Sequence, residues 1–208
     1  MADVNPVRGK FVTLEGVDGT GKSTHVPWIA ERLRQGGREV VVTREPGGTP
    51  LAEKLRALVL VETMDPLSET MLMFAARADH VVRVIRPALA RGAWVVCDRF
   101  TDATLAYQAG GKGVSTDLIR RLAQSVHPGL VPDQTLVFDC PYEVSRSRLD
   151  ASGRELDRFE AEARGFFERV RRTYRELAQS EPDRVRIIDS SKTQEEIKEE
   201  VNKYLIYI

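Results

Sequence analysis

Residues 16–23 read Gly16-Val17-Asp18-Gly19-Thr20-Gly21-Lys22-Ser23 and match the pattern G-x-x-x-x-G-K-[ST]. The apolar run Phe11–Leu14 precedes them, and a helical pattern follows. Glycines allow backbone angles closed to other residues, so successive N–H groups can turn inward toward phosphates at a helix N-terminus. The stretch predicts a P-loop that binds a nucleoside triphosphate, with Lys22 reaching the β- and γ-phosphates and the Ser23 hydroxyl ligating Mg²⁺. The competing interpretation is a chance glycine turn.

Working outward, four more short apolar runs resemble Phe11–Leu14 in being rich in β-branched residues. Such uninterrupted runs are typical of strands buried on both faces. Helix-length segments separate them, which predicts an α/β fold: a P-loop three-layer sandwich with a five-stranded parallel sheet flanked by helices. A length of 208 residues suits a single domain over residues 1–208. The four further strands are expected at Glu39–Thr43, Ala93–Cys97, Thr135–Phe138 and Val185–Ile188.

Helix boundaries are marked by caps, glycines and prolines. The first helix should begin after Gly21 and stop at Gly36-Gly37. A long helix should start at Asp65-Pro66 and run over Pro66–Ala90, with Pro87 expected to kink or end it. Further helices are expected at Thr116–Val126, Pro141–Leu149, Arg158–Gln179 and Thr193–Tyr204.

Composition limits the classes of partner and compartment. Lysine plus arginine and aspartate plus glutamate both number 31, and this balance argues against wholesale binding of nucleic acid or anionic membrane. No run is long enough to span a membrane, and Met1 to Gly9 lacks the apolar stretch of a signal peptide. Cys97 and Cys140 each end an apolar run and are expected to be buried free thiols. We therefore expect a cytoplasmic enzyme.

The P-loop alone leaves kinase, ATPase and GTPase open. A GTPase usually reads guanine with an N-K-x-D loop, but the only Asn-Lys pair is Asn202-Lys203, inside the last predicted helix and with no aspartate after it. Asp18 is informative, because a carboxylate beside a triphosphate is costly unless it contacts a metal or another group. A sugar hydroxyl of a second substrate would be a good target. The alternative is a solvated loop aspartate.

Three further polar segments follow predicted strands, where open α/β sheets bind ligands. They are Arg44–Thr49, the stretch from Asp98-Arg99-Phe100 through Thr104–Gln108 to Gly111, and an arginine-rich stretch from Arg146 to Arg158. Together with the P-loop they carry the marks of one family. These marks are Glu-Gly-Val-Asp-Gly-Thr-Gly-Lys-Ser, Thr-Arg-Glu-Pro-Gly-Gly-Thr, Phe-Ala-Ala-Arg at 74–77, Asp-Arg-Phe with Ala-Tyr-Gln, and Glu-Leu-Asp-Arg-Phe-Glu at 155–160.

In this order and spacing the motifs resemble the bacterial thymidylate kinase family over nearly the whole chain, from about Lys10 to Tyr204. The resemblance implies transfer of the γ-phosphoryl group of ATP to dTMP, with Mg²⁺, to give ADP and dTDP. Two alternatives stay open: another (deoxy)nucleoside monophosphate as acceptor, and a regulatory P-loop NTPase without an acceptor. The resemblance also implies a homodimer, for which Pro66–Ala90 is a candidate interface.

The resemblance assigns acceptor-side roles to several residues, each with a plainer alternative. Phe74 would stack on thymine, or it packs in the core and its neighbour Met73 takes that face. Arg77 would hydrogen-bond the pyrimidine edge, or it is solvated. Gln108 would read the remaining donor and acceptor of the base. Tyr107 would pack under the deoxyribose, or is structural. Asp18 and Thr104 complete this part of the expected dTMP site.

Phosphate and metal contacts follow from the same resemblance. Arg56 and Arg99 would hold the acceptor phosphate, which suits the planar fork of arginine. Glu45 would bind near that phosphate through water or metal. Asp98 would hold Mg²⁺ through water together with Ser23, or it caps a helix.

The arginine-rich stretch at about 146–158 resembles the family's mobile lid. It contains Arg146, Arg148, Arg154 and Arg158, and the P-loop supplies no arginine of its own. The implied catalytic set is Lys22, Arg99 and Arg154, because an added arginine can neutralise charge on the transferring phosphoryl group. The alternative is a helix with ordinary ion pairs. Lys192, after the last strand, would border the adenine of ATP.

Overall fold

The computed structural model describes residues 8–153, 155 and 157–205, and Arg154 therefore lies outside the described residues. The strands are β1 (Phe11–Glu15), β2 (Val40–Arg44), β3 (Trp94–Asp98), β4 (Gln134–Asp139) and β5 (Val185–Asp189). All pair in parallel in the order β2-β3-β1-β4-β5, so the predicted five-stranded parallel sheet is confirmed. Each strand lies within two residues of its expected bounds.

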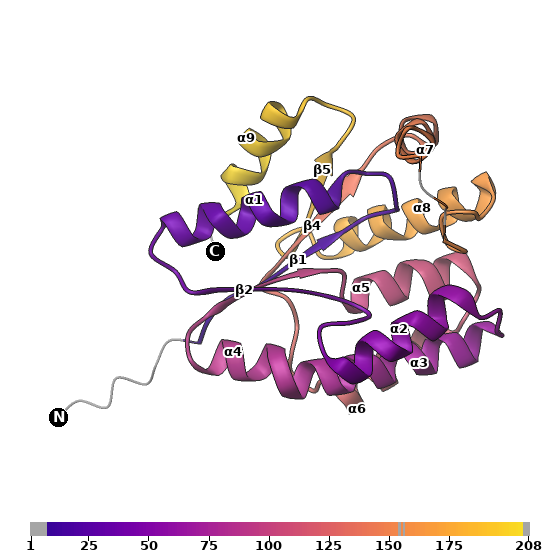
Figure 1. The fold of residues 1–208 in the computed structure, drawn as a ribbon, viewed down its shortest axis with the longest axis horizontal. Helices are drawn as coiled ribbons and strands as arrows, with labels where there is room; N and C mark the ends of the chain where they lie inside the picture. The colour runs from indigo at the N-terminus through magenta and orange to yellow at the C-terminus, as the bar shows by residue number, and fades with distance from the viewer. Residues whose placement is uncertain (1–7, 154, 156, 206–208) are drawn as a thin grey trace.

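Helices connect the strands and cover both faces of the sheet (Figure 1). Up to β3 they are α1 (Lys22–Gln35), α2 (Pro50–Val61), α3 (Pro66–His80), the π-helical turn η1 (Val81–Ile85) and α4 (Arg86–Ala90). After β3 come α5 (Thr101–Thr104), the π-helical segment η2 (Leu105–Gly111), α6 (Thr116–Val126), α7 (Tyr142–Ala151), α8 (Arg164–Ser180) and α9 (Gln194–Leu205). None of the described helices is long and apolar enough to cross a membrane.

The two faces of the sheet bury alternate residues of each strand. On one face Val12, Leu14 and Phe138 pack with α1 and α9, which lie together above the sheet in Figure 1. On the other face Phe11 and Val95 pack with η1 and α4. Farther along this second face, residues of β4 and β5 pack with η2 and α8. The three-layer arrangement is thus built by strands that are apolar on both sides.

The long predicted helix over Pro66–Ala90 is helical throughout but is not one regular α-helix. Asp65 accepts hydrogen bonds from Leu67 N and Ser68 N, which confirms the predicted start. The helix does not end at Pro87; it continues to Ala90, and the irregularity takes the form of the π-helical turn η1. Pro87 lies in the first turn of α4, where its missing N–H is tolerated.

The segment between α7 and α8 differs from its expectation. The predicted helix Arg158–Gln179 begins at Arg164 instead. The Asp157 carboxylate accepts hydrogen bonds from the backbone N–H groups of Phe159 and Glu160, which favours a turn over a helix here. Two helical stretches, α2 and α5 with η2, were not predicted. Cys97 and Cys140 are buried and free, as expected.

Candidate active site

The P-loop joins β1 to α1 at the carboxyl edge of the sheet. Gly16 and Gly19 have φ values of 127° and 77°, a region that favours glycine. A Cβ on Gly16 would lie 2.3 Å from the Phe138 carbonyl oxygen, so a larger residue cannot replace it. The Lys22 ammonium donates to the carbonyl oxygens of Gly16 and Val17 at 2.8 and 2.9 Å. The loop therefore forms a turn around its own lysine.

The Lys22 ammonium is buried and has a lowered pKa. Burial, and then the nearby Arg99 guanidinium, lower the pKa of Lys22 to about 8, although Asp18 and Asp98 partly offset this. A buried cation with a depressed pKa gains from a fully paired anion. The site is thus electrostatically ready for a polyphosphate.

Asp98 ends β3 directly beside β1, with Leu14 as its register partner. Its Oδ1 atom is buried and has no hydrogen-bond partner within the part of the chain that the structure describes. Ser23, exposed in the first turn of α1, lines the same polar cavity as Asp98 and Lys22. A free carboxylate oxygen and a hydroxyl are suitable ligands for Mg²⁺, which usually takes few protein ligands and keeps water and phosphate oxygens. These two residues therefore fit the expected metal position.

Arg99 connects the P-loop to the neighbouring cavity. It is the one non-glycine residue among those described with a positive φ, 71°, and such strained backbone clusters at functional sites. Its guanidinium donates to Gly16 O at 3.1 Å and to Asp18 Oδ1 at 2.5 Å, and it lies 4.8 Å from the centre of the Tyr107 ring. The two predicted halves of the site, P-loop and acceptor side, meet at this side chain.

The Asp18 carboxylate is stabilised by neighbouring cations and not by solvent. Burial alone would raise the pKa of Asp18, but Arg99 and Lys22 outweigh burial and hold the pKa at about 2. The Tyr107 hydroxyl donates to Asp18 Oδ2 at 3.0 Å. The expectation of a merely solvated loop aspartate does not fit these contacts.

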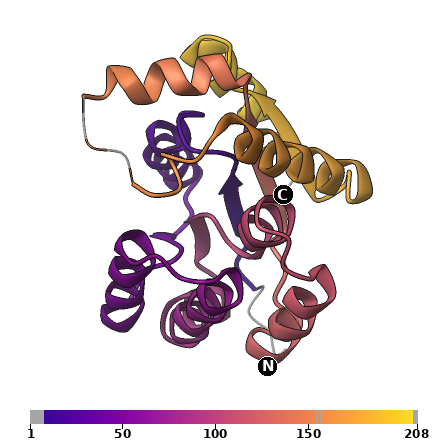
Figure 2. The ribbon, with the colours of Figure 1, turned by 90° about the vertical axis from the view of Figure 1, so that its right-hand side faces the viewer.

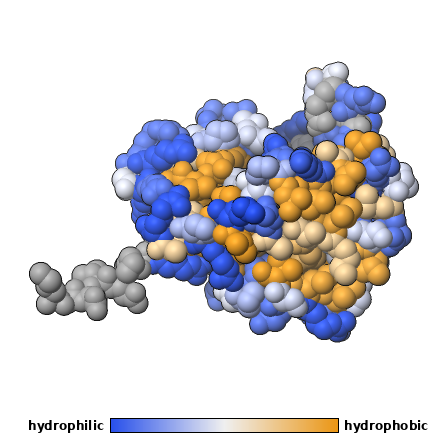
Figure 3. Space-filling model, turned by 60° about the horizontal axis from the view of Figure 1, so that its bottom comes forward, coloured by the Kyte–Doolittle hydropathy of each residue, from blue (hydrophilic) through white to orange (hydrophobic). Residues whose placement is uncertain are grey.

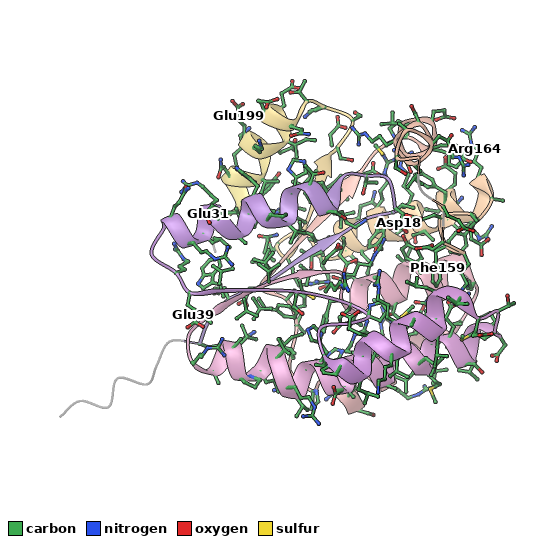
Figure 4. All side chains as sticks on the ribbon, viewed as in Figure 1. Asp18, Glu31, Glu39, Phe159, Arg164 and Glu199 are labelled. Carbon is green, nitrogen blue, oxygen red and sulfur yellow. The ribbon has the colours of Figure 1, made fainter. Side chains whose placement is uncertain are left out.

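A second cavity opens next to Asp18 and is lined by residues of the P-loop, α2, α3, α5, η2 and the turn at 157–159 before α8. Figure 2 shows how the ribbons of these elements are arranged. Asp18 and Phe159, which both line it, are labelled in Figure 4. Most residues predicted for the acceptor site line this cavity: Asp18, Glu45, Arg56, Arg77, Arg99, Thr104, Tyr107 and Gln108. Six other lining residues had no predicted role: Pro46, Val59, Leu60, Ala103, Asp157 and Phe159. Pro46, Asp157 and Phe159 nevertheless lie within the motifs that carry the family resemblance.

Arg77 is buried at one wall of this cavity, and three hydrogen bonds hold its guanidinium. Its Nε donates to Glu45 Oε2 at 2.6 Å, and one terminal nitrogen donates to Phe100 O at 3.1 Å and Thr104 Oγ1 at 3.0 Å. The other terminal nitrogen, Nη1, is buried and has no hydrogen-bond partner among the described residues. Buried donors are rarely left unpaired, so Nη1 is a candidate contact for a ligand acceptor. A solvated surface role does not fit this burial.

Glu45 is committed to protein partners. One carboxylate oxygen accepts from Arg77, and the other lies 2.9 Å from His80 Nδ1. Burial would raise the pKa of Glu45, but Arg77 and His80 outweigh burial and lower it. Although Glu45 lines the cavity, its two oxygens hold Arg77 and His80 in this structure. Its expected contact with phosphate through water or metal would require sharing these oxygens.

Phe74 was the residue expected to contact the base, but Met73 lines the cavity and Phe74 does not. Phe74 is 2% exposed, lies under the Arg77 guanidinium at 4.7 Å from the ring centre, and is not part of the cavity wall. Met73 lines the cavity instead. The reason is helical geometry, because Met73 is one full turn from Arg77 and shares its face more closely than Phe74 does.

The described lid arginines have separate partners. Arg146 pairs with Asp150 at 3.0 Å in an ordinary i,i+4 ion pair, and Arg148 donates to Ser190 O at 2.9 Å. Arg158 donates to Glu69 and to Val59 O at the far end of the acceptor cavity. Arg154, expected to be the catalytic lid residue, lies outside the described residues. Lys192, expected near adenine, is exposed and lies 3.2 Å from Glu200.

Glu69 is the site residue that the sequence missed most completely. It is 0% exposed and accepts a hydrogen bond from the Gln108 amide at 2.8 Å. Its spacing offered one signal, since Glu69, Met73 and Arg77 recur every four residues and so share one helix face. A glutamate near the start of a helix is usually solvated, so the burial of Glu69 was not expected from the sequence.

The chain was compared with known proteins. The family model described as thymidylate kinase matches residues 14–201. Among curated relatives, "Thymidylate kinase" of Bordetella petrii is 57% identical over 95% of each chain, and that of Pseudomonas putida is 54% identical over 95% of each chain. A crystal structure of thymidylate kinase from Ehrlichia chaffeensis matches with a TM-score of 0.77 and 35% identity, over 95% of this chain and 99% of that one. The chain belongs to the thymidylate kinase family.

Proposed function

We propose that this protein transfers the γ-phosphoryl group of ATP to dTMP, giving ADP and dTDP. The observation that carries the proposal is Arg99, whose guanidinium bonds both Gly16 of the P-loop and Asp18 at the rim of the acceptor cavity. A P-loop next to an arginine-lined cavity is what transfer between two phosphates requires. A regulatory NTPase would have no use for the second cavity.

On the donor side, the amides of residues 16–23 and the Lys22 ammonium would hold the triphosphate of ATP. Lys22 would leave its contacts with Gly16 O and Val17 O for the phosphate oxygens. Ser23 and Asp98 would hold Mg²⁺, with Asp98 acting through its buried, unused Oδ1 atom. When bound, Mg²⁺ would neutralise charge on the phosphates. Lys192 would border adenine after moving away from Glu200.

On the acceptor side, Arg77 Nη1 would donate to a carbonyl oxygen of thymine, since it is a buried donor fixed by Glu45 and Thr104. Gln108 would read the neighbouring position of the base. Met73, rather than Phe74, would contact the face of the ring, because Met73 lines the cavity and a thioether packs well on aromatic rings. Tyr107 and Asp18 would contact the deoxyribose.

The acceptor phosphate would lie between Arg56 and Arg99, whose planar forks suit phosphate oxygens. This phosphate is already ionised at neutral pH, so the reaction needs positioning and charge neutralisation more than a strong base. Lys22, Arg99 and a lid arginine would supply the charge. We assign the lid contribution to Arg154, the lid arginine that the family resemblance favours and that lies outside the described residues. Closure of the lid would exclude water.

The acceptor is tested by a coupled assay of ADP release with a panel of monophosphates. We expect kcat/KM to be highest for dTMP and at least about tenfold lower for dCMP and AMP, because a buried donor or acceptor left unpaired costs about 1–3 kcal/mol. Slow ATP hydrolysis that no nucleotide acceptor accelerates would contradict the proposal. Equal turnover of all monophosphates would contradict dTMP as the acceptor.

We also propose that the protein forms a homodimer through α2 and α3. Several large apolar side chains of this surface are between 48% and 77% exposed: Leu51, Leu58, Val61, Leu67, Met71 and Val82. Figure 3 views the molecule from the side of these helices and shows a broad apolar area. Contiguous apolar patches of this kind mark interaction surfaces, and two-fold dimers are the commonest assembly. The predicted interface helix Pro66–Ala90 contributes Leu67, Met71 and Val82.

Met71→Glu is expected to convert the dimer to a monomer, because it places a charge within this apolar surface. Light scattering after size-exclusion chromatography at micromolar concentration measures the mass. Gln35→Glu is the matched control, since it adds the same charge at an exposed position of α1 on the opposite face of the sheet. The proposal fails if the unmodified protein is monomeric or if Met71→Glu leaves the mass unchanged.

A further inference from the structure

Glu69 is a fully buried carboxylate behind the wall of the acceptor cavity. Its Oε1 atom accepts a hydrogen bond from Gln108 Nε2 at 2.8 Å. Its Oε2 atom accepts from Lys112 Nζ at 2.8 Å and from Arg158. Glu69 itself is 0% exposed and does not line the cavity, whereas Gln108 does. Glu69 therefore acts on a ligand only through its partners.

The charge of Glu69 decides which way the Gln108 amide points. Lys112 and Arg158 supply the positive charge that a buried carboxylate needs, and an ionised carboxylate can only accept hydrogen bonds. Gln108 must then turn its NH₂ group toward Glu69. The side-chain oxygen of Gln108, Oε1, receives no hydrogen bond from any described residue and is left for a ligand in the cavity, which Gln108 lines.

We propose that Glu69 is a positioning residue that fixes Gln108 as a hydrogen-bond acceptor toward the cavity and so selects pyrimidines that carry an N3–H donor. This inference rests on the proposed function and refines its specificity. Thymine and uracil have N3–H and a carbonyl at position 4. Cytosine has a bare N3 acceptor and an amino group at position 4. The Arg77 donor, held by Glu45, and the Gln108 acceptor, held by Glu69, match the first pattern and oppose the second.

The substitution Glu69→Gln is expected to reverse the orientation of the Gln108 amide. Lys112 and Arg158 both donate to the Oε2 position, so the oxygen of the new amide will stay there. Its nitrogen then faces the NH₂ group of Gln108, donor against donor. Gln108 must rotate its amide by half a turn, which presents an N–H donor to the cavity and suits the N3 acceptor of cytosine.

The test measures kcat/KM for dTMP, dUMP and dCMP with the unmodified protein and the variant. We expect Glu69→Gln to lower the dTMP/dCMP ratio of kcat/KM by about tenfold or more, since one buried hydrogen-bond mismatch is removed for dCMP and one is created for dTMP. The dTMP/dUMP ratio should stay within about twofold, because both bases have the same N3–H edge. General structural damage would lower all three values together and leave the ratios unchanged, and that outcome would overturn the proposal.

Lys112→Met is the matched control. It removes one charge partner of Glu69 but leaves an acceptor-only carboxylate facing Gln108, so its dTMP/dCMP ratio should stay near that of the unmodified protein even if its activity falls. A ratio that changes equally in both variants would show that loss of the charge cluster is responsible, and would contradict the proposal. Failure of the unmodified protein to phosphorylate dTMP would instead refute the proposed function.

A second measurement applies if Glu69→Gln does not fold. In a crystal structure of the unmodified protein with dTMP, the Gln108 side chain should keep its contact with Glu69 and lie within about 3.2 Å of thymine N3. Rotation of Gln108 away from Glu69 on binding would overturn the proposal.

Discussion

Replacing Lys22 by alanine is expected to lower kcat/KM for phosphoryl transfer by about 10³-fold, the scale at which lost electrostatic stabilisation reduces catalysis. Within the described part of the chain, this ammonium donates hydrogen bonds to the carbonyl oxygens of Gly16 and Val17. Burial and Arg99 depress its pKa to about 8, so the charge is held at a cost to the folded state. The lysine is therefore kept for a bound anion and not for stability.

Lys22→Ala should lower activity without lowering the stability of the fold. Lys22→Ala should melt at a temperature no lower than that of the unmodified protein, since it removes a poorly solvated charge. Lys10→Ala is the control: its ammonium lies 3.4 Å from Asp133 at the start of β1, remote from the P-loop, and its turnover should be retained. Steady-state kinetics and thermal unfolding check both variants. Near-normal kcat in Lys22→Ala would contradict the role assigned to the P-loop lysine.

The second large effect is expected at Arg99, whose replacement by alanine should lower kcat/KM for dTMP by about 10²- to 10³-fold. Arg99 bonds Gly16 and Asp18 together and would hold the acceptor phosphate. Its loss removes the main charge that depresses the pKa of Asp18, so the pKa of that carboxyl should rise toward its ordinary value. Donor and acceptor subsites would then lose their common contact.

A pair of variants distinguishes function from backbone strain at this position. Arg99 has a φ of 71°. This backbone conformation costs alanine about 1 kcal/mol or more, whereas glycine adopts it without that cost. Arg99→Gly should therefore melt higher than Arg99→Ala while losing the same activity. Arg99→Lys should recover part of the activity, because it keeps the charge but not the planar fork. Full activity in Arg99→Gly would show that the guanidinium has no role.

The sheet and the P-loop were predictable because their signals are local. Apolar, β-branched runs defined all five strands, including the edge strand β2, which is only partly buried. The glycine spacing at 16–21 predicted the loop that follows β1. Helix α2 was missed even though Thr49 caps it through a bond to Ala52 N and Pro50 follows directly. Its apolar residues are largely exposed, so they produced no core-facing stripe.

Within the site, residue type was easier to predict than the direction of a side chain. The family resemblance marked Arg56, Arg77, Arg99 and Gln108 as ligand-binding residues, and the structure gathers them around one cavity. The exchange of Met73 for Phe74 depends on one residue of helical phase, which sequence spacing near an irregular helix does not resolve. The contact of Glu69 with Gln108 could not be predicted because it depends on Glu69 being buried, and the sequence does not show this burial.

Phosphorylation of dTMP by this protein requires that one cavity bring the acceptor nucleotide to the P-loop. A crystal structure with a non-hydrolysable ATP analogue, Mg²⁺ and dTMP tests it most directly. We predict the triphosphate in the P-loop, thymine against Met73 within hydrogen-bond distance of Arg77 Nη1 and Gln108, and the dTMP phosphate on Arg99. An empty cavity at saturating dTMP, or dTMP bound elsewhere with Arg77 Nη1 still unpaired, would contradict it.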